Sequence, residues 1–179
     1  MSQELLLLST DRIGIRKIIC RRKYPSLLLI PVYIRKIHMI SAAAILETSH
    51  RIPNLDYDIL MKLTLQLTKS MEECEKLYRL MCFNVFAHNR DDHSKNFSYI
   101  YRDREKRWIL SPAYDLTYSN SIGGEHATTV NGNGVDPGME DLLSVAKKIG
   151  IGMAKAKKRQ QRFRNVCMND CVTIYPIRK

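Results

Sequence analysis

The densest group of side chains able to do chemistry lies in the stretch FAHNRDDHSKNFSYIY, which begins at Phe86. Two histidines, two adjacent aspartates, a lysine and two asparagines fall within nine positions of it. Its most regular feature is Asp91 followed five residues later by Asn96, the D-x-x-x-x-N spacing associated with phosphoryl transfer. This spacing selects Asp91 rather than the neighbouring Asp92 as the functional carboxylate.

Phosphoryl transfer needs a carboxylate that orients the attacking hydroxyl, and oxygen ligands for the magnesium ion that bridges the nucleotide phosphates. Asp91 is the predicted base, and Asn96 and Asp115 are the predicted magnesium ligands. Asp115, in SPAYD, fits because a hairpin beginning at Phe97 would return the chain to the loop. Lys95 adds positive charge toward the transferred group. The predicted cofactor-binding residues are His93, Lys95, Asn96 and Asp115.

Two other interpretations of the same stretch stay open. A lone D-x-x-x-x-N spacing occurs by chance in many chains, and adjacent aspartates are common in solvated turns. His88 and His93, with the two aspartates between them, would also suit zinc or manganese. The remaining histidines are isolated in the sequence and are predicted to lie at the surface or the core edge: His38, His50 and His126.

Two amphipathic helices are predicted to deliver the chain to this stretch. The first covers residues 55–67, with an apolar stripe of Leu55, Ile59, Leu60, Leu63 and Leu67. The second starts at Ser70, which forms a predicted capping box with Glu73. Its buried stripe is predicted to be Met71, Cys74, Leu77, Tyr78, Met81 and Val85. Phe83 and Phe86 are expected to help position the loop.

A β-hairpin is predicted after the stretch, over residues 97–113, with its turn in RDREK. Residues 119–138 are glycine-rich and loop-like. Asp136 and Pro137 supply start signals for a helix that runs to Ile149 and stops at Gly150. A last, basic helix is expected over residues 153–166. Residues 1–30 show neither a helical period nor alternation, so we expect them to be poorly packed.

Composition describes a globular chain of 179 residues that is 45% hydrophobic. The formal charge of +11 divides into +6 for residues 1–40, −4 for residues 41–146 and +9 for residues 147–179. The basic excess is therefore at the two ends, where basic segments are usually solvated. The five cysteines form no C-x-x-C motif, which indicates free thiols in a reducing compartment. The apolar runs are too short to cross a membrane, so a cytoplasmic protein is expected.

Taken together and in order, DDHSKN, SPAYD and the glycine-rich GGEHATTVNGNG form a specific combination. It resembles the C-terminal part of HipA-type toxin kinases over about residues 35–150. The resemblance implies a mainly α (α+β) fold, with a helical C-terminal lobe over residues 35–152 and a basic helix and tail over residues 153–179. It also implies an ATP- and magnesium-dependent serine/threonine protein kinase of a bacterial toxin–antitoxin system. Its expected partners are a protein substrate and a DNA-binding antitoxin.

The chain departs from that family in residues 1–34, where relatives carry the lobe that holds the nucleotide. Gly14 is the only glycine before Asp91, so no phosphate-covering loop is recognisable there. We therefore expect a truncated member that is inactive alone, unless a separately encoded N-terminal lobe completes it. The alternative is a non-enzymatic remnant that binds an antitoxin, or nucleic acid through its basic ends.

Overall fold

The computed structural model describes residues 7–10, 16–19, 37–47, 55–119 and 124–167, which fall into two units, Met1–Ile37 and His38–Lys179. In the first unit, strands β1 (Leu7–Thr10) and β2 (Arg16–Ile19) pair in antiparallel register. The sequence pattern did not predict these strands. Backbone groups make the pairing, and a short ladder does not require one apolar face.

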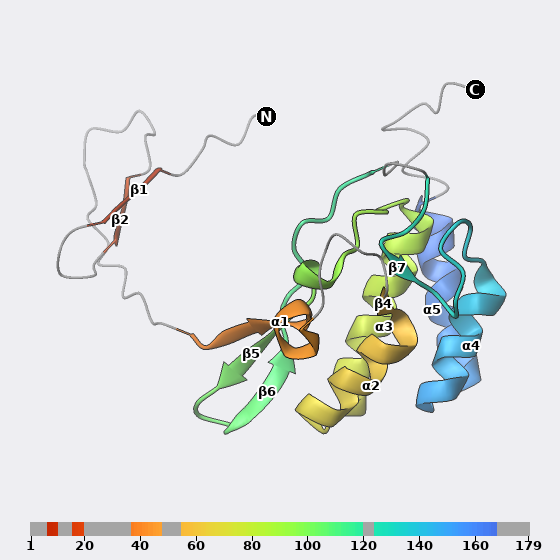
Figure 1. Ribbon diagram of the computed structural model, residues 1–179, viewed down its shortest axis with the longest axis horizontal. Coiled ribbons are helices and arrows are strands. Elements are labelled where there is room, and N and C mark those ends of the chain that lie inside the picture. The colour runs from red at the N-terminus through yellow and green to blue at the C-terminus, as the bar shows by residue number, and fades with distance from the viewer. Residues whose placement is uncertain (1–6, 11–15, 20–36, 48–54, 120–123, 168–179) are drawn as a thin grey trace. The chain divides into compact units, whose positions relative to one another are not determined.

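The second unit contains a three-stranded antiparallel sheet in the order β3-β5-β6 (Figure 1). Strands β5 (Ser98–Arg102) and β6 (Arg107–Leu110) form the predicted hairpin, and the turn between them lies in the predicted RDREK segment. Strand β3 (Met39–Ser41) adds to β5 from far along the chain, and the sequence pattern did not predict it. The sheet thus places the chain after β6 close to the start of β5.

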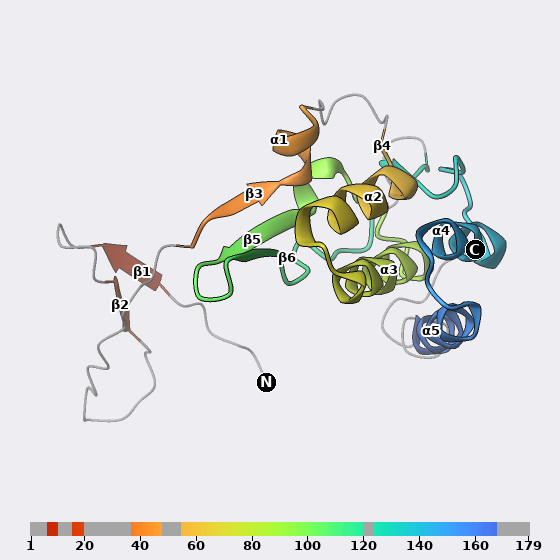
Figure 2. The same ribbon diagram turned by 90° about the horizontal axis from the view of Figure 1, so that it is seen from below.

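Helices α2 (Tyr57–Thr68) and α3 (Met71–Phe86) form the middle of this unit, packed on β6 on one side and on α4 on the other (Figure 2). The predicted core is confirmed, since all of its members are buried: Leu60, Leu63, Leu77, Met81 and Val85. The prediction of burial is wrong for two members of the apolar stripes, because Ile59 is 43% exposed and Met71 is 37% exposed. Tyr57 and Met61 take the buried positions in the first turns of α2 instead. Phe83 and Phe86 are half-buried.

The predicted capping box at the start of α3 is also wrong. Ser70 occupies the N-cap position, but its side chain makes no capping hydrogen bond. Glu73 is buried and accepts instead from the backbone N–H of Leu110, at 3.0 Å, and from Lys76 Nζ, at 2.7 Å. A buried N–H at a strand end needs an acceptor. Glu73 therefore bonds to the distant Leu110 rather than to the backbone at the start of its own helix.

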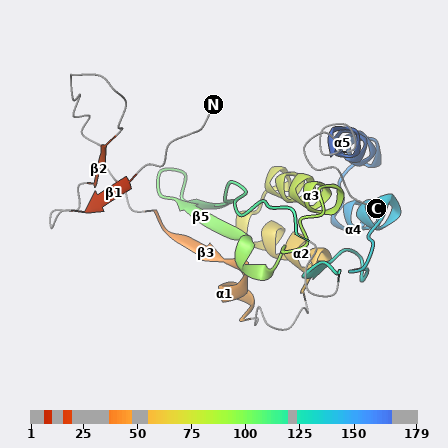
Figure 3. The same cartoon turned by 90° about the horizontal axis from the view of Figure 1, so that it is seen from above.

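Helices α4 (Met139–Ile149) and α5 (Met153–Val166) cover the far side of α2 and α3 (Figure 3). The end of α4 at Gly150, which has a φ of 88°, and the basic last helix are both as predicted. The start of α4 is later than predicted. Gly138 is the N-cap, and its N–H donates to Asp141 at 2.9 Å, so Asp136 and Pro137 precede the helix.

The remaining elements are short. Helix α1 (Ala42–Leu46) follows β3, and β4 (Leu55–Asp56) pairs in parallel with β7 (Thr128–Thr129) inside the glycine-rich segment. The predicted free thiols of Cys74 and Cys82 are confirmed, and both side chains are buried, as is that of Cys167. Cys20, Cys171 and His50 lie outside the described residues. No helix among the described residues is long and apolar enough to span a membrane.

Candidate active site

The loop that carries the predicted catalytic residues joins the end of α3 to a single 3₁₀ turn, η1 (Ser94–Asn96). His88 has a left-handed backbone, with a φ of 52°, where the chain leaves α3. His93 caps the turn, because its Nδ1 accepts from the N–H of Lys95 at 3.3 Å. This cap fixes where Lys95 and Asn96 sit relative to the loop.

Asp91 and Asn96 face each other across this loop. The side-chain Nδ2 of Asn96 donates to the carbonyl oxygen of Asp91 at 2.8 Å. Because that bond uses the amide nitrogen, Oδ1 of Asn96 is left for another partner. The Asp91 side chain is 56% exposed, and its Oδ1 lies 3.8 Å from Nε2 of His93. An open carboxylate and an oriented amide oxygen therefore lie on one tight loop.

Asp92 has the opposite environment. Its side chain is fully buried, and the carboxylate accepts three hydrogen bonds. The donors are the Tyr57 hydroxyl at 3.0 Å, His126 Nδ1 at 3.2 Å and the backbone N–H of Thr128 at 3.2 Å. The two adjacent aspartates thus differ completely in access to solvent, and Asp91 is the one that a substrate could reach.

The segment SPAYD returns to the loop, as the hairpin predicted. The Tyr114 hydroxyl lies 2.6 Å from the carbonyl oxygen of Lys95 and 2.6 Å from Ser98 Oγ. Asp115, the next residue, is exposed and has a left-handed backbone with a φ of 55°. Tyr114 therefore holds the segment carrying Asp115 against the turn that carries Lys95, whose side chain is also exposed. Asn96 and Asp115 offer the amide and carboxylate oxygens that suit magnesium.

The alternative of a zinc or manganese site is not supported. Across the parts of the chain that the structure describes, no group of three or more His, Cys, Asp or Glu side chains could hold a metal. The ring of His88 packs edge-on against Tyr118, with ring centroids 6.4 Å apart. Burial, together with the charge of Arg90, lowers the pKa of His88. Asp92, which that alternative also needed, is engaged by its buried partners.

Sequence reasoning missed the partners of Asp92. His126 was predicted at the surface or core edge, but it is 3% exposed and buried beside Asp92; His38 is exposed, as predicted. The Tyr57 hydroxyl accepts from Asn84, which in turn accepts from Asn89 at 2.9 Å. Partners 34 to 36 residues away leave no local signal, although His126 does lie within the glycine-rich segment singled out above.

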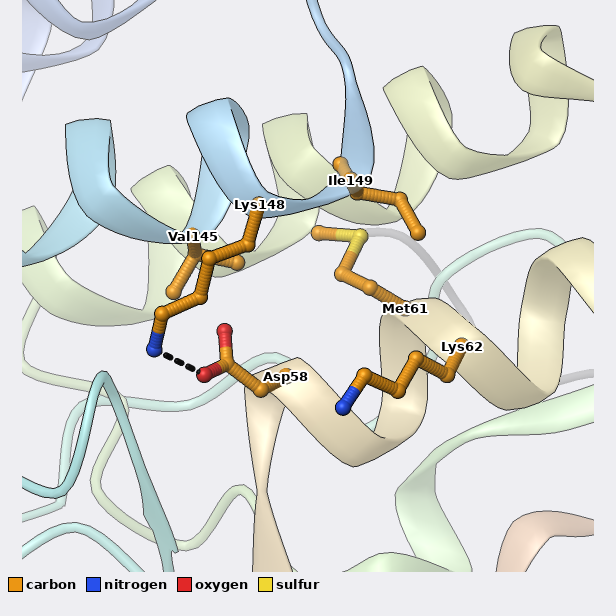
Figure 4. A pocket seen from close by; sticks show the side chains of 6 residues that line it. All are labelled: Asp58, Met61, Lys62, Val145, Lys148 and Ile149. Atoms are coloured by element: carbon orange, nitrogen blue, oxygen red, sulfur yellow. Dashed lines mark hydrogen bonds and ion pairs between the residues drawn. The ribbon is translucent and has the colours of Figure 1, made fainter.

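A small hollow between α2 and α4 contains none of the predicted site residues (Figure 4). Lys148 of α4 crosses its edge, where it forms an ion pair with Asp58 and donates to Asn131 at 2.7 Å. Asn131 also accepts from Ser144 of α4. These contacts fix the turn after β7 to the helices and so support the segment that contributes His126.

Comparison with known proteins identifies the class of protein that this fold and loop define. The model of the HipA-like C-terminal domain matches residues 11–171, and the chain belongs to this family. No curated protein matches the chain.

A similar solved structure is HipA of Shewanella oneidensis MR-1, determined in a complex of a toxin–antitoxin system with HipB and operator DNA. The TM-score is 0.59 at 13% sequence identity. The match covers 98% of this chain but 46% of that HipA chain. The similarity is therefore one of fold, and the chain spans about half the length of its structural relative.

Proposed function

We propose that the chain carries the catalytic part of a cytoplasmic HipA-type serine/threonine protein kinase that uses ATP and magnesium. The observation that carries this proposal is the loop itself. Asn96 bonds to the Asp91 backbone, the Asp91 carboxylate is open, and Tyr114 holds the Asp115 segment beside Lys95. Family membership supports the same conclusion.

Each residue has a definite role in this proposal. Asp91 orients the substrate hydroxyl and accepts its proton, since an exposed carboxylate at the loop surface is accessible to a protein substrate. Asn96 Oδ1 and the Asp115 carboxylate would hold a magnesium ion, which would supply positive charge against the nucleotide phosphates. In this proposal Lys95 and His93, which follow Asp91 on the loop, contribute positive charge and hydrogen bonds to the nucleotide.

The proposed partner is a DNA-binding antitoxin, in the setting of a bacterial toxin–antitoxin system. The similar HipA chain is found with HipB and operator DNA, which supports a partner of this kind. Direct contact of this chain with DNA is not required, because a bound antitoxin would supply it.

The 179-residue chain by itself should not transfer phosphate. Nucleotide needs backbone donors over its phosphates and an orienting lysine, and residues 1–90 contain Gly14 as their only glycine. Positioning and charge stabilisation are most of what such an enzyme contributes. Joining the N-terminal half of a complete HipA ahead of residue 11, where the family match begins, should therefore create activity.

The test is radioactive phosphate transfer from ATP by the joined protein. Activity should appear, should be abolished by Asp91→Asn and should fall less with Asp92→Asn. Phosphorylation by the unjoined chain would contradict the need for a second half. A joined protein that folds but stays inactive would favour a binding remnant, and activity that survives Asp91→Asn would refute the assigned base.

A further inference from the structure

We propose that Asp92 and His126 act as paired positioning residues, which anchor the loop carrying Asp91 to residues 126–128 of the glycine-rich segment. The meaning of this anchoring for catalysis rests on the proposed function, whereas the anchoring itself is a property of the fold. Neither residue would touch substrate. Their role is to hold Asp91 and Asn96 in one arrangement.

The direction of every hydrogen bond at Asp92 follows from chemistry. A carboxylate has no hydrogen to give, so each of its partners must donate. The Tyr57 hydroxyl accepts from Asn84 Nδ2 at 2.8 Å, which leaves its own hydrogen for Asp92. His126 must carry a hydrogen on Nδ1, which fixes the orientation of its ring. Burial and the nearby Asp92 raise the pKa of Tyr57 well above its usual value, so the hydroxyl keeps its proton.

The buried Asp92 and its three donors, which we call the anchor, join elements that are distant in the sequence. Tyr57 begins α2, His126 lies within the glycine-rich segment, and Thr128 belongs to β7. A buried charge is tolerated only where such donors surround it. Asp92 therefore has one stable position, and the loop must adopt the conformation that supplies it.

Two hydrogen bonds to the backbone of the loop extend the anchor to both sides of Asp91. The N–H of Ala127 donates to the carbonyl oxygen of Arg90 at 3.1 Å, and Thr128 Oγ1 donates to that of Asp92 at 2.5 Å. Arg90, before Asp91, is thus bonded to Ala127, and Asp92, after it, is bonded to Thr128. A displacement of Asp91 would have to break bonds on both sides.

Matched variants separate this role from a general contribution to stability. Tyr57→Phe removes one donor to Asp92. Tyr99→Phe removes an equally buried hydroxyl, which lies 2.8 Å from Thr64 Oγ1 of α2. His126→Ala removes the ring, whereas His126→Asn keeps an N–H donor close to the position of Nδ1.

The first measurement is amide hydrogen exchange by NMR in the full chain, at Asn96 and Ala127. Both amides donate backbone hydrogen bonds, at 2.9 Å to His93 and at 3.1 Å to Arg90. Tyr57→Phe and His126→Ala should speed this exchange by at least about tenfold, the lower bound that corresponds to losing one hydrogen bond to a charged group. His126→Asn should largely restore protection, and Tyr99→Phe should lower the melting temperature without affecting these two amides. Unchanged exchange in Tyr57→Phe and His126→Ala, or equal loosening by Tyr99→Phe, would overturn the proposal.

The second measurement uses the protein joined to a complete N-terminal half. His126→Ala should lower kcat by about tenfold with the KM for ATP unchanged, and His126→Asn should recover most of the loss. If His126→Ala leaves kcat unchanged, the positioning role is refuted. If the unsubstituted joined protein is itself inactive while the exchange results hold, the anchor stands and the proposed kinase function fails.

Discussion

The Tyr114 hydroxyl donates a hydrogen bond of 2.6 Å to the carbonyl oxygen of Lys95. Since that hydrogen is used, Ser98 Oγ, also 2.6 Å away, must donate to Tyr114. One phenol thus connects the first residue of β5, the 3₁₀ turn and the segment that carries Asp115. It is the direct link between the two parts of the proposed magnesium site.

Replacing Tyr114 by Phe should remove this link while keeping the ring. We expect a loss of about 1 kcal/mol in the free energy of unfolding, typical of one hydrogen bond, measured by urea denaturation. In the protein joined to a complete N-terminal half, manganese binding in the presence of ATP, followed by electron paramagnetic resonance, should weaken because Asp115 is released. Tyr101→Phe is the control in the same hairpin, since its ring packs on Trp108. Equal manganese affinities in the two variants would contradict the proposed metal site.

The buried carboxylate of Glu73 gives a second prediction. Glu73→Leu should destabilise the protein by about 1–3 kcal/mol, because the N–H of Leu110 would remain buried without an acceptor. Ser70→Ala should cost less than about 0.5 kcal/mol, since the Ser70 side chain makes no capping bond. Urea denaturation of both variants decides the matter. A larger loss for Ser70→Ala than for Glu73→Leu would restore the local capping box.

The face of α3 that packs in the core gives a third prediction. Leu77 is fully buried, so Leu77→Ala should cost about 2–5 kcal/mol through lost burial and the cavity it leaves. Met71→Ala, on the same predicted stripe but 37% exposed, should cost less than about 1 kcal/mol. Calorimetric melting of the two variants tests the helix face, and similar losses would show that it is assigned wrongly.

Alkaline pH should weaken the fold within a definite window. Burial raises the pKa of Tyr99 from its ordinary 10.0 to about 12, so the folded chain keeps a proton that the unfolded chain releases. Stability should therefore be unaffected by this group below about pH 10 and should fall between about pH 10 and 12, by up to about 1.4 kcal/mol per pH unit. Urea denaturation at several pH values measures the slope. Tyr99→Phe should reduce it, and an unchanged slope would contradict the assignment.

Local patterns predicted the parts of the fold that depend on neighbours in the sequence. The apolar period of α3 placed Leu77 and Met81 in the core, and the turn signals in RDREK placed the β5–β6 hairpin. The D-x-x-x-x-N spacing also selected the exposed aspartate of the pair, Asp91, before its exposure was known.

The parts that escaped prediction depend on contacts between distant residues. Glu73 has the right spacing for a cap, but its carboxylate accepts a hydrogen bond from the backbone N–H of Leu110 on β6 instead. His126 looks isolated because its partner, Asp92, is 34 residues away. Strand β7 is only two residues long, so alternation cannot be recognised in it. The spacing of residues within one segment cannot predict contacts with residues that are distant in the sequence.

The parallel pairing of β4 with β7 has a consequence for the order in which the protein folds. Leu55 and Thr129 lie 74 residues apart, and the entropy lost in closing a chain loop grows with its length. The contact between α2 and α3 closes a much shorter loop, so these helices can associate early. The anchor of Asp92 depends on β7 and must close afterwards. We therefore expect the loop around Asp91 to assemble among the last parts of the fold and to open first under mild denaturant, while the helices remain intact.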